Sequence, residues 1–293
     1  MSALSHHEGN VSSLDLVGLS RLMARTSGRP EIAIGLIDSP IALNHPDLPT
    51  ANIHRISGDV PTGNKTACAH GTFIAGVLVA RRGSLAPAIC PECRLLVRPI
   101  FAKELPPGEV VPGATVETLA GAIVEVVDAG ARIINLSLAI QGQSSRGSAL
   151  DQALTHALRR GVVVIAAAGN ERALGGSTLT CCPWIIPVVA YNSRGRPMEI
   201  SNLGATIGRY GLGAPGEAIS SLGTTGDPMT MEGTSVATPF VAGAVALLWS
   251  EFPDASAAEV RYAVTQSARR RTAIVPPLLN AWAGYEAMSR VRS

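Results

Sequence analysis

The sequence predicts a large α/β domain, with a three-layer, doubly wound and mostly parallel sheet that carries helices on both faces. Segments typical of strands alternate with segments of helical periodicity along most of the 293 residues. The segments at residues 31–37 and 161–168 are nearly continuous apolar runs, as expected for parallel strands covered on both sides. No internal repeat or low-complexity linker divides the chain, so we expect one core.

The predicted secondary-structure elements begin near residue 12. Residues 12–26 show apolar positions at helical spacing, and Gly28 and Pro30 follow them, so residues 1–30 are interpreted as a helical N-terminal extension of a main domain over residues 31–293. Segments of strand-like composition predict strands at residues 31–37, 94–100, 132–138, 161–168, 182–190 and 217–222. Helical spacing predicts helices at residues 70–77, 115–129, 148–160, 235–249, 257–267 and 280–290.

The charge pattern argues against nucleic-acid and membrane partners. The formal net charge is +2, 16% of residues are charged, and the one basic cluster is a short run at residues 269–271. Residues 233–250 lack charge, but they contain proline, serine and threonine and have no second span to pair with, which favours a buried central helix. Because residues 1–10 lack the apolar core of a secretory signal, we expect a cytoplasmic protein.

The chain has five cysteines, and this odd number does not suggest the disulfide framework of a secreted protein. Cys90 and Cys93 have the spacing of half a zinc site or of a redox pair, but the chain has no second pair of this kind. We therefore expect no metal and no other cofactor. Cys68 lies two residues before His70, which leaves a cysteine–histidine nucleophile as a minor alternative.

Ser235 is the first candidate for catalysis. Gly233 allows a sharp turn, Ser235 falls where a helix begins, and Pro239 is still near the first turn, where proline is tolerated. The free N–H groups and positive dipole end of a helix start favour an anion, such as the oxyanion of a tetrahedral intermediate. A serine that merely caps the helix is an equally good interpretation of this stretch alone.

Three further polar residues stand at strand ends or helix starts. Asp38 ends the first predicted strand, His70 begins a helix, and Asn170 follows a fully apolar strand. Each has an ordinary interpretation, as a strand-end acid, a capping histidine or a Gly-Asn turn. Together with Ser235 they gather at the sheet edge where α/β enzymes place their sites, and the order along the chain is Asp, His, Ser.

Four blocks around these residues resemble the signatures of subtilisin-like serine proteases, which share that order. The blocks are residues 36–39 (LIDS), 70–76 (HGTFIAG), 166–170 (AAAGN) and 233–239 (GTSVATP). The resemblance extends over residues 32–287 and implies a peptidase. It implies that Ser235 is the nucleophile, His70 the general base and then acid, Asp38 its orienting partner, and Asn170 the oxyanion donor. The residues implied to bind substrate are Ser137, Leu138, Ala139 and Glu171.

The chain departs from the family pattern at several positions. Ala139 stands where the family commonly has glycine, which implies a narrowed or reshaped specificity pocket. Phe73 and Phe240 stand where histidines are common, outside the triad. Asp47 matches an aspartate that often ligates calcium in the family, but residues 80–88 are too short for the companion loop, so we expect no calcium there.

Shorter blocks at residues 34–40 and 93–101, and a cysteine near Pro183, are similar to the proteases that mature cyanobactin-type ribosomal peptides. This similarity implies removal of a leader from a precursor peptide in the cytoplasm. Two alternatives stay open. One is a broad intracellular degradative subtilisin, and the other is a peptide-binding pseudoprotease that uses the strand edge at Ser137 without turnover.

Overall fold

The computed structural model describes residues 12–57, 68–100, 115–138, 148–266 and 274–292. Its main element is a seven-stranded sheet in the order β2-β3-β1-β4-β5-β6-β7, with every neighbouring pair parallel. The strands are β1 (Ala33–Asp38), β2 (Ile53–Arg55), β3 (Arg94–Pro99), β4 (Ile133–Leu136), β5 (Val163–Ala167), β6 (Ile185–Tyr191) and β7 (Leu212–Pro215). The predicted α/β fold with a parallel sheet is confirmed.

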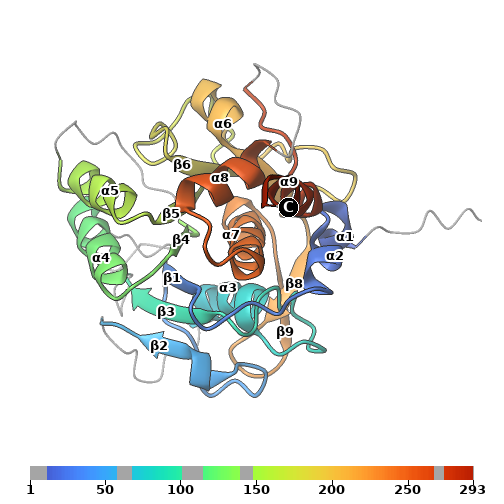
Figure 1. Cartoon of the computed structure of the whole chain (residues 1–293). Helices are drawn as coiled ribbons and strands as arrows, with labels where there is room; N and C mark the ends of the chain where they lie inside the picture. The colour runs from blue at the N-terminus through green and yellow to red at the C-terminus, as the bar shows by residue number, and fades with distance from the viewer. Residues whose placement is uncertain (1–11, 58–67, 101–114, 139–147, 267–273, 293) are drawn as a thin grey trace, which may run out of the picture.

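Helices cover both faces of this sheet (Figure 1). They are α1 (Ser13–Leu16), α2 (Leu19–Met23), α3 (Ala69–Val79), α4 (Val116–Asp128), α5 (Ala149–Arg159), α6 (Ala205–Tyr210), α7 (Thr234–Glu251), α8 (Ala257–Gln266) and α9 (Ala281–Arg292). A short 3₁₀ helix, η1 (Thr50–Asn52), precedes β2. A separate antiparallel pair, β8 (Ile219–Leu222) with β9 (Pro228–Met231), leads into α7.

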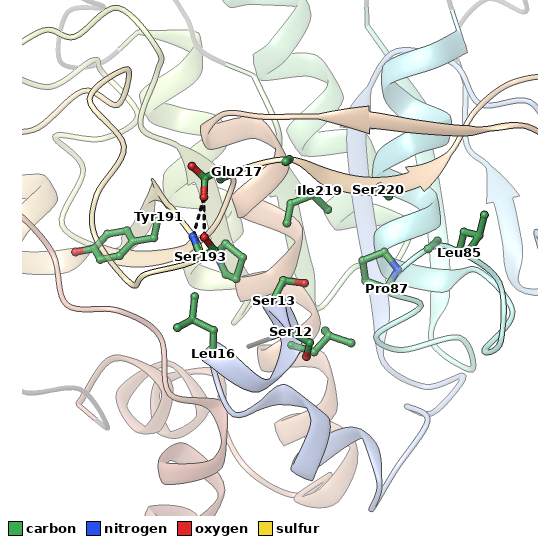
Figure 2. Close-up of a pocket in the computed structure, with 14 residues that line it drawn as sticks. Ser12, Ser13, Leu16, Leu85, Pro87, Tyr191, Ser193, Glu217, Ile219 and Ser220 are labelled. Carbon is green, nitrogen blue, oxygen red and sulfur yellow. Dashed lines mark hydrogen bonds between the residues drawn. The ribbon is translucent and has the colours of Figure 1, made fainter. Parts of the chain in front are cut away.

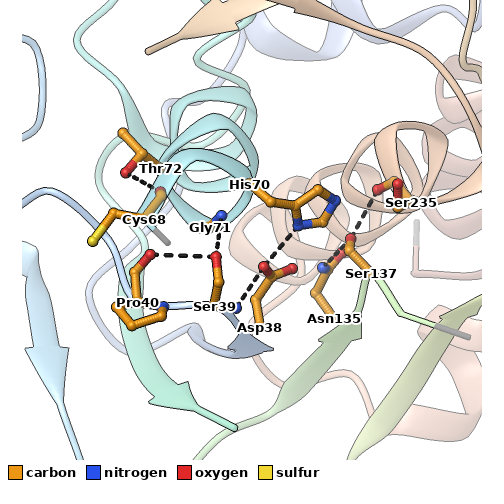
Figure 3. Close-up of polar contacts among 10 residues, drawn as sticks. All are labelled: Asp38, Ser39, Pro40, Cys68, His70, Gly71, Thr72, Asn135, Ser137 and Ser235. Carbon is orange, nitrogen blue, oxygen red and sulfur yellow. Dashed lines mark hydrogen bonds and ion pairs between the residues drawn. The ribbon is translucent and has the colours of Figure 1, made fainter. Parts of the chain in front are cut away.

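The two layers follow from the alternation of side chains along each strand. In β1, Ile34 and Leu36 face the layer of α3 and α7, whereas Ala33 and Ile37 face the layer of α4 and α5. All six residues of β1 are buried, as the apolar run predicted for a strand covered on both sides. Asp38 therefore shares the face of Leu36 and points toward α3 and α7 (Figure 3).

Helix α7 is the central helix of the molecule. Every residue from Val236 to Ser250 is buried, and so is Thr234, whereas Ser235 is half-exposed. Among the described residues, no helix is long and apolar enough to cross a membrane. The uncharged stretch is therefore a core helix, as expected.

The prediction of a single helix over residues 12–26 is wrong in detail. Gly18 interrupts this segment, because its backbone adopts the left-handed conformation with φ 68°. The two short helices that result, α1 and α2, place Val17, Leu19 and Leu22 in the same core as α7. Strand β7 was not predicted, because its Leu-Gly-Ala-Pro run is short and consists mostly of small residues. Gly213 is required there, since a Cβ would collide with the ring of Tyr191.

Candidate active site

A buried Asp38 and a partly exposed His70 form one half of the site. Asp38 is the last residue of β1 and is fully buried. Its Oδ1 accepts a hydrogen bond from Nδ1 of His70 at 2.7 Å and another from the backbone N–H of Ser39 at 2.6 Å. Because Nδ1 donates to Asp38, the neutral imidazole leaves Nε2 with its lone pair free, which is the atom a general base needs.

Two opposing effects act on the pKa of His70. Burial lowers the pKa, whereas the charge of Asp38 and its hydrogen bond raise it, and the net result is a pKa raised above 6.5. The Asp38 carboxylate thus stabilises the imidazolium that forms when the histidine accepts a proton.

The first turn of α3 is fixed against the end of β1, which sets the place of His70. The hydroxyl of Ser39 accepts from the N–H of Gly71 at 2.8 Å, and the hydroxyl of Thr72 accepts from the N–H of Ala42 at 2.9 Å. Gly71 has no room for a side chain, because a Cβ would collide with the carbonyl oxygen of Ser39. Sequence reasoning did not assign roles to Ser39 or Thr72, because neither their bonds nor this close approach leaves a signal in the sequence.

Ser235 is the second residue of α7, and the ring of His70 lies between it and Asp38 (Figure 3). The hydrogen bonds of the described residues include none between Ser235 and His70. Such catalytic bonds are often long in the free enzyme and tighten with substrate. The three residues expected to form the triad are thus brought together from β1, α3 and α7.

Asn170 follows β5 and is held by the residue before Ser235. Its Oδ1 accepts from the backbone N–H of Thr234 at 2.9 Å and is 3.0 Å from the Thr234 hydroxyl. A backbone N–H can only donate, so the carbonyl end of the amide must face Thr234. The NH₂ end of Asn170 is left for another acceptor, as an oxyanion donor requires. Sequence reasoning did not single out Thr234.

The residues expected to bind substrate differ in exposure. Ser137 is buried, and its hydroxyl donates to the carbonyl oxygen of Ser235 at 2.8 Å, so this side chain supports α7. Leu138 is also buried, and its side chain joins the core on the α4 and α5 side. Glu171 is exposed and bonds to Asn202. Ala139 lies outside the described residues, as do residues 269–271.

The five cysteines are free thiols in this structure. Cys68 directly precedes α3, and burial raises the pKa of its thiol, which opposes formation of a thiolate nucleophile. Cys90 and Cys93 are buried in the core. Among the described residues, no group of three or more histidine, cysteine, aspartate or glutamate side chains has an arrangement that could hold a metal ion.

A cavity of about 510 Å³ lies apart from these residues, between α1, the loop before Pro87 and the start of β8 (Figure 2). Its lining includes the apolar side chains of Leu16, Leu85 and Ile219. Glu217 also lines it, and the Glu217 carboxylate accepts a hydrogen bond from the N–H of Ser193 at 2.9 Å. None of the expected catalytic residues lines it.

Comparison with known proteins places the chain in a family. The model of the subtilase family, peptidase S8, matches residues 29–285. Subtilisin DY of Bacillus licheniformis is 28% identical over 261 residues, which are 87% of this chain and 90% of that protein. For three other subtilisins, the matched region spans 58% of the relative's length.

Two solved structures are also similar. The prenylagaramide maturation protease PagA has a TM-score of 0.81 at 28% identity, with coverage of 92% of this chain and 97% of that one. The patellamide maturation protease PatA has a TM-score of 0.76 at 29% identity, with coverage of 90% and 98%. The family model extends over most of the chain, and the chain therefore belongs to the subtilase family of serine peptidases.

Proposed function

We propose that this subtilase is an endopeptidase in which Ser235, His70 and Asp38 act as the triad and Asn170 as the oxyanion donor. Oγ of Ser235 attacks the scissile carbonyl carbon, and its proton passes to Nε2 of His70. The carbonyl oxygen becomes an anion that the NH₂ group of Asn170 stabilises. The intermediate collapses to an acyl-enzyme as His70 gives its proton to the leaving amine. A water molecule then attacks the acyl-enzyme by the same steps, which releases the carboxylic acid product and regenerates Ser235.

The observation that carries this proposal is the arrangement around the ring of His70. Nδ1 donates at 2.7 Å to a carboxylate that is fully buried, and Ser235 lies on the other side of the ring. The amide of Asn170 is turned by Thr234 so that its donor end is free. A serine that only capped a helix would need none of these partners.

A fluorophosphonate probe tests the nucleophile. We expect it to label the wild type on Ser235, as mapped by mass spectrometry, and not to label Ser235→Ala or heat-unfolded wild type. Equal labelling of Ser235→Ala, or labelling of Cys68, would overturn the assignment. A wild type that binds peptides but is neither labelled nor turns them over would instead support the pseudoprotease alternative.

We further propose that the substrate is a ribosomally made precursor peptide whose leader is removed in the cytoplasm, with neither nucleic acid nor membrane as a partner. Support comes from the sequence blocks at residues 34–40 and 93–101, and from similarity to PagA and PatA, which are described as maturation proteases. The predicted strand edge at Ser137 and Leu138 would pair with the peptide main chain, and Ala139 and Glu171 would contact its side chains.

A broad degradative protease is the second candidate, because the chain matches 90% of the length of subtilisin DY. Incubation with casein and, separately, with a leader-containing precursor peptide distinguishes the two, with cuts mapped by mass spectrometry. We expect one dominant cut at the leader boundary and few in casein. Many scattered cuts in casein would favour the degradative enzyme and contradict leader removal.

A further inference from the structure

The loop that carries Asn170 is organised by a single side chain, that of Asn202. Its Oδ1 accepts from the N–H of Glu171 at 3.1 Å and from the N–H of Ala173 at 2.9 Å. Its Nδ2 donates to the Glu171 carboxylate, and its own N–H donates to the carbonyl oxygen of Gly169 at 2.9 Å. Asn202 therefore bonds to the residues on both sides of Asn170 and to Ala173.

The approach of Asn202 depends on the glycine before Asn170. Gly169 has φ 104°, a conformation that favours glycine, and a Cβ there would collide with Nδ2 of Asn202. The chain thus leaves β5 in a turn that brings Asn202 directly against the backbone. Both N–H groups that Asn202 accepts from can only donate, so its amide orientation is fixed in the same way as that of Asn170.

Asn170 itself is held at two points. Thr234 fixes the side-chain amide, and Asn202 fixes the peptide groups that flank it. We propose that Asn202 is a positioning residue that holds the donor end of Asn170 where the oxyanion forms. This inference rests on the proposed function, because it assumes that Asn170 stabilises the oxyanion.

Loss of the Asn202 side chain would loosen the loop without unfolding it. The N–H of Arg172 donates to the carbonyl oxygen of Ile200 at 3.1 Å, and that of Leu203 donates to Ala173 at 3.0 Å, and these backbone bonds remain. The N–H groups of Glu171 and Ala173 would lose their acceptor. A displacement of about 1 Å at a catalytic group can cost up to about 10²-fold in rate, so the effect should appear in the chemical step.

Asn192 offers a matched control. Its Oδ1 also accepts from two backbone N–H groups, those of Arg194 at 3.1 Å and Arg196 at 3.0 Å, in the turn after β6. Asn202→Ala and Asn192→Ala therefore remove the same kind of contact. We expect Asn202→Ala to lower the phosphonylation rate at saturating fluorophosphonate by about 10-fold, with little change in probe affinity, and Asn192→Ala to leave it within about 2-fold.

A double-mutant cycle separates positioning from general support. Asn170→Ala alone should lower the rate by about 10²–10³-fold, the size known for loss of one oxyanion donor in subtilisin. If Asn202 acts through Asn170, adding Asn202→Ala to Asn170→Ala should lower the rate by less than about 2-fold more. Thermal unfolding of each variant shows whether it is folded at the assay temperature.

Three outcomes would overturn the inference. The first is that Asn202→Ala lowers the phosphonylation rate equally in the wild type and in Asn170→Ala. The second is that Asn192→Ala lowers this rate as much as Asn202→Ala does. The third is that Asn202→Ala has a lower melting temperature but an unchanged phosphonylation rate. Failure of the proposed function looks different, because the wild type itself would then show no labelling at Ser235.

Discussion

Ser137 donates a hydrogen bond of 2.8 Å to the backbone carbonyl oxygen of Ser235, joining the end of β4 to the first turn of α7. In a regular helix that carbonyl would accept from the residue four positions on, which is Pro239 and has no N–H. Ser137 therefore supplies the donor that the proline cannot. Asn135, fully buried, donates in turn to the hydroxyl of Ser137 at 2.8 Å.

Ser137→Ala should leave the Ser235 carbonyl without this donor and loosen the start of α7. We expect kcat to fall by about 10-fold and the free energy of unfolding by about 1–2 kcal/mol. Ser221→Ala is a suitable control, because the buried hydroxyl of Ser221 donates at 2.8 Å to the carbonyl oxygen of Phe73, also in a helix. It should show a similar loss of stability with little loss of kcat, measured by denaturant unfolding and peptide cleavage. Equal effects on kcat would mean that the Ser137 bond serves stability alone.

The pH profile should report the environment of His70. Only the neutral imidazole can act as base, and its pKa is raised, so kcat/KM should rise with pH and be half-maximal above 6.5. Asp38→Asn removes the charge that raises the pKa and leaves burial, which lowers it. The kcat of Asp38→Asn should be about 10⁴-fold lower than that of the wild type. The activity that remains should rise with pH at a lower pH than in the wild type. A profile that does not move between the two enzymes would show that another group is titrating.

Gly233 should be needed both for its backbone conformation and for its lack of a side chain. Its φ is 122°, and a Cβ would lie 3.0 Å from Nδ2 of Asn170. Gly226 has φ 97°, with nothing within 4 Å of the position of a Cβ, so Gly226→Ala measures the conformational cost alone. We expect each alanine variant to lose about 1–2 kcal/mol of stability. Only Gly233→Ala should lose activity as well, because the new methyl group pushes against Asn170. If the two variants kept equal activity, the contact with Asn170 would be unimportant.

Arg82 should link the N-terminal helices α1 and α2 to the segment that follows α3. Its guanidinium donates to the carbonyl oxygens of Met23 at 2.7 Å, Thr26 at 2.8 Å and Ile89 at 3.2 Å. Arg82→Ala should lower the free energy of unfolding by about 1–3 kcal/mol, and Arg82→Lys should recover only part, because an ammonium group lacks the planar fork. Arg81→Ala, at the adjacent exposed position, should have an effect below about 0.5 kcal/mol. Denaturant unfolding of the three variants provides the test, and equal losses for Arg81→Ala and Arg82→Ala would refute it.

Thiol reactivity should differ sharply among the five cysteines. Cys181 is exposed, and Cys90 and Cys93 are buried. Burial raises the pKa of Cys68, and it raises the pKa of Cys182 to about 11. Because the thiolate is the reactive form, a disulfide reagent at pH 8 should modify one thiol quickly, and Cys181→Ala should abolish that fast phase. The remaining thiols should react only slowly in the folded protein and fully in denaturant. A fast phase that survives in Cys181→Ala would contradict this order.

The sequence alone predicted the fold class and most of the strands, and it singled out the four residues that we propose perform the chemistry. Parallel strands that are covered on both faces need long apolar runs, so β1, β5 and β6 could be predicted from the sequence. Asp38, His70 and Asn170 stand where those runs end or a helix begins, which is a local pattern that one chain segment carries by itself.

The tertiary structure was needed for what holds those residues in place. The role of Ser137 depends on a carbonyl 98 positions away, and that of Thr234 depends on an amide 64 positions away. Asn202 acts on a loop about 30 residues earlier. Hydrogen bonds between distant segments leave no periodicity in the sequence, because they depend on how the strands and helices pack. The sequence therefore identified the residues expected to react, and only the folded chain revealed the ones that orient them.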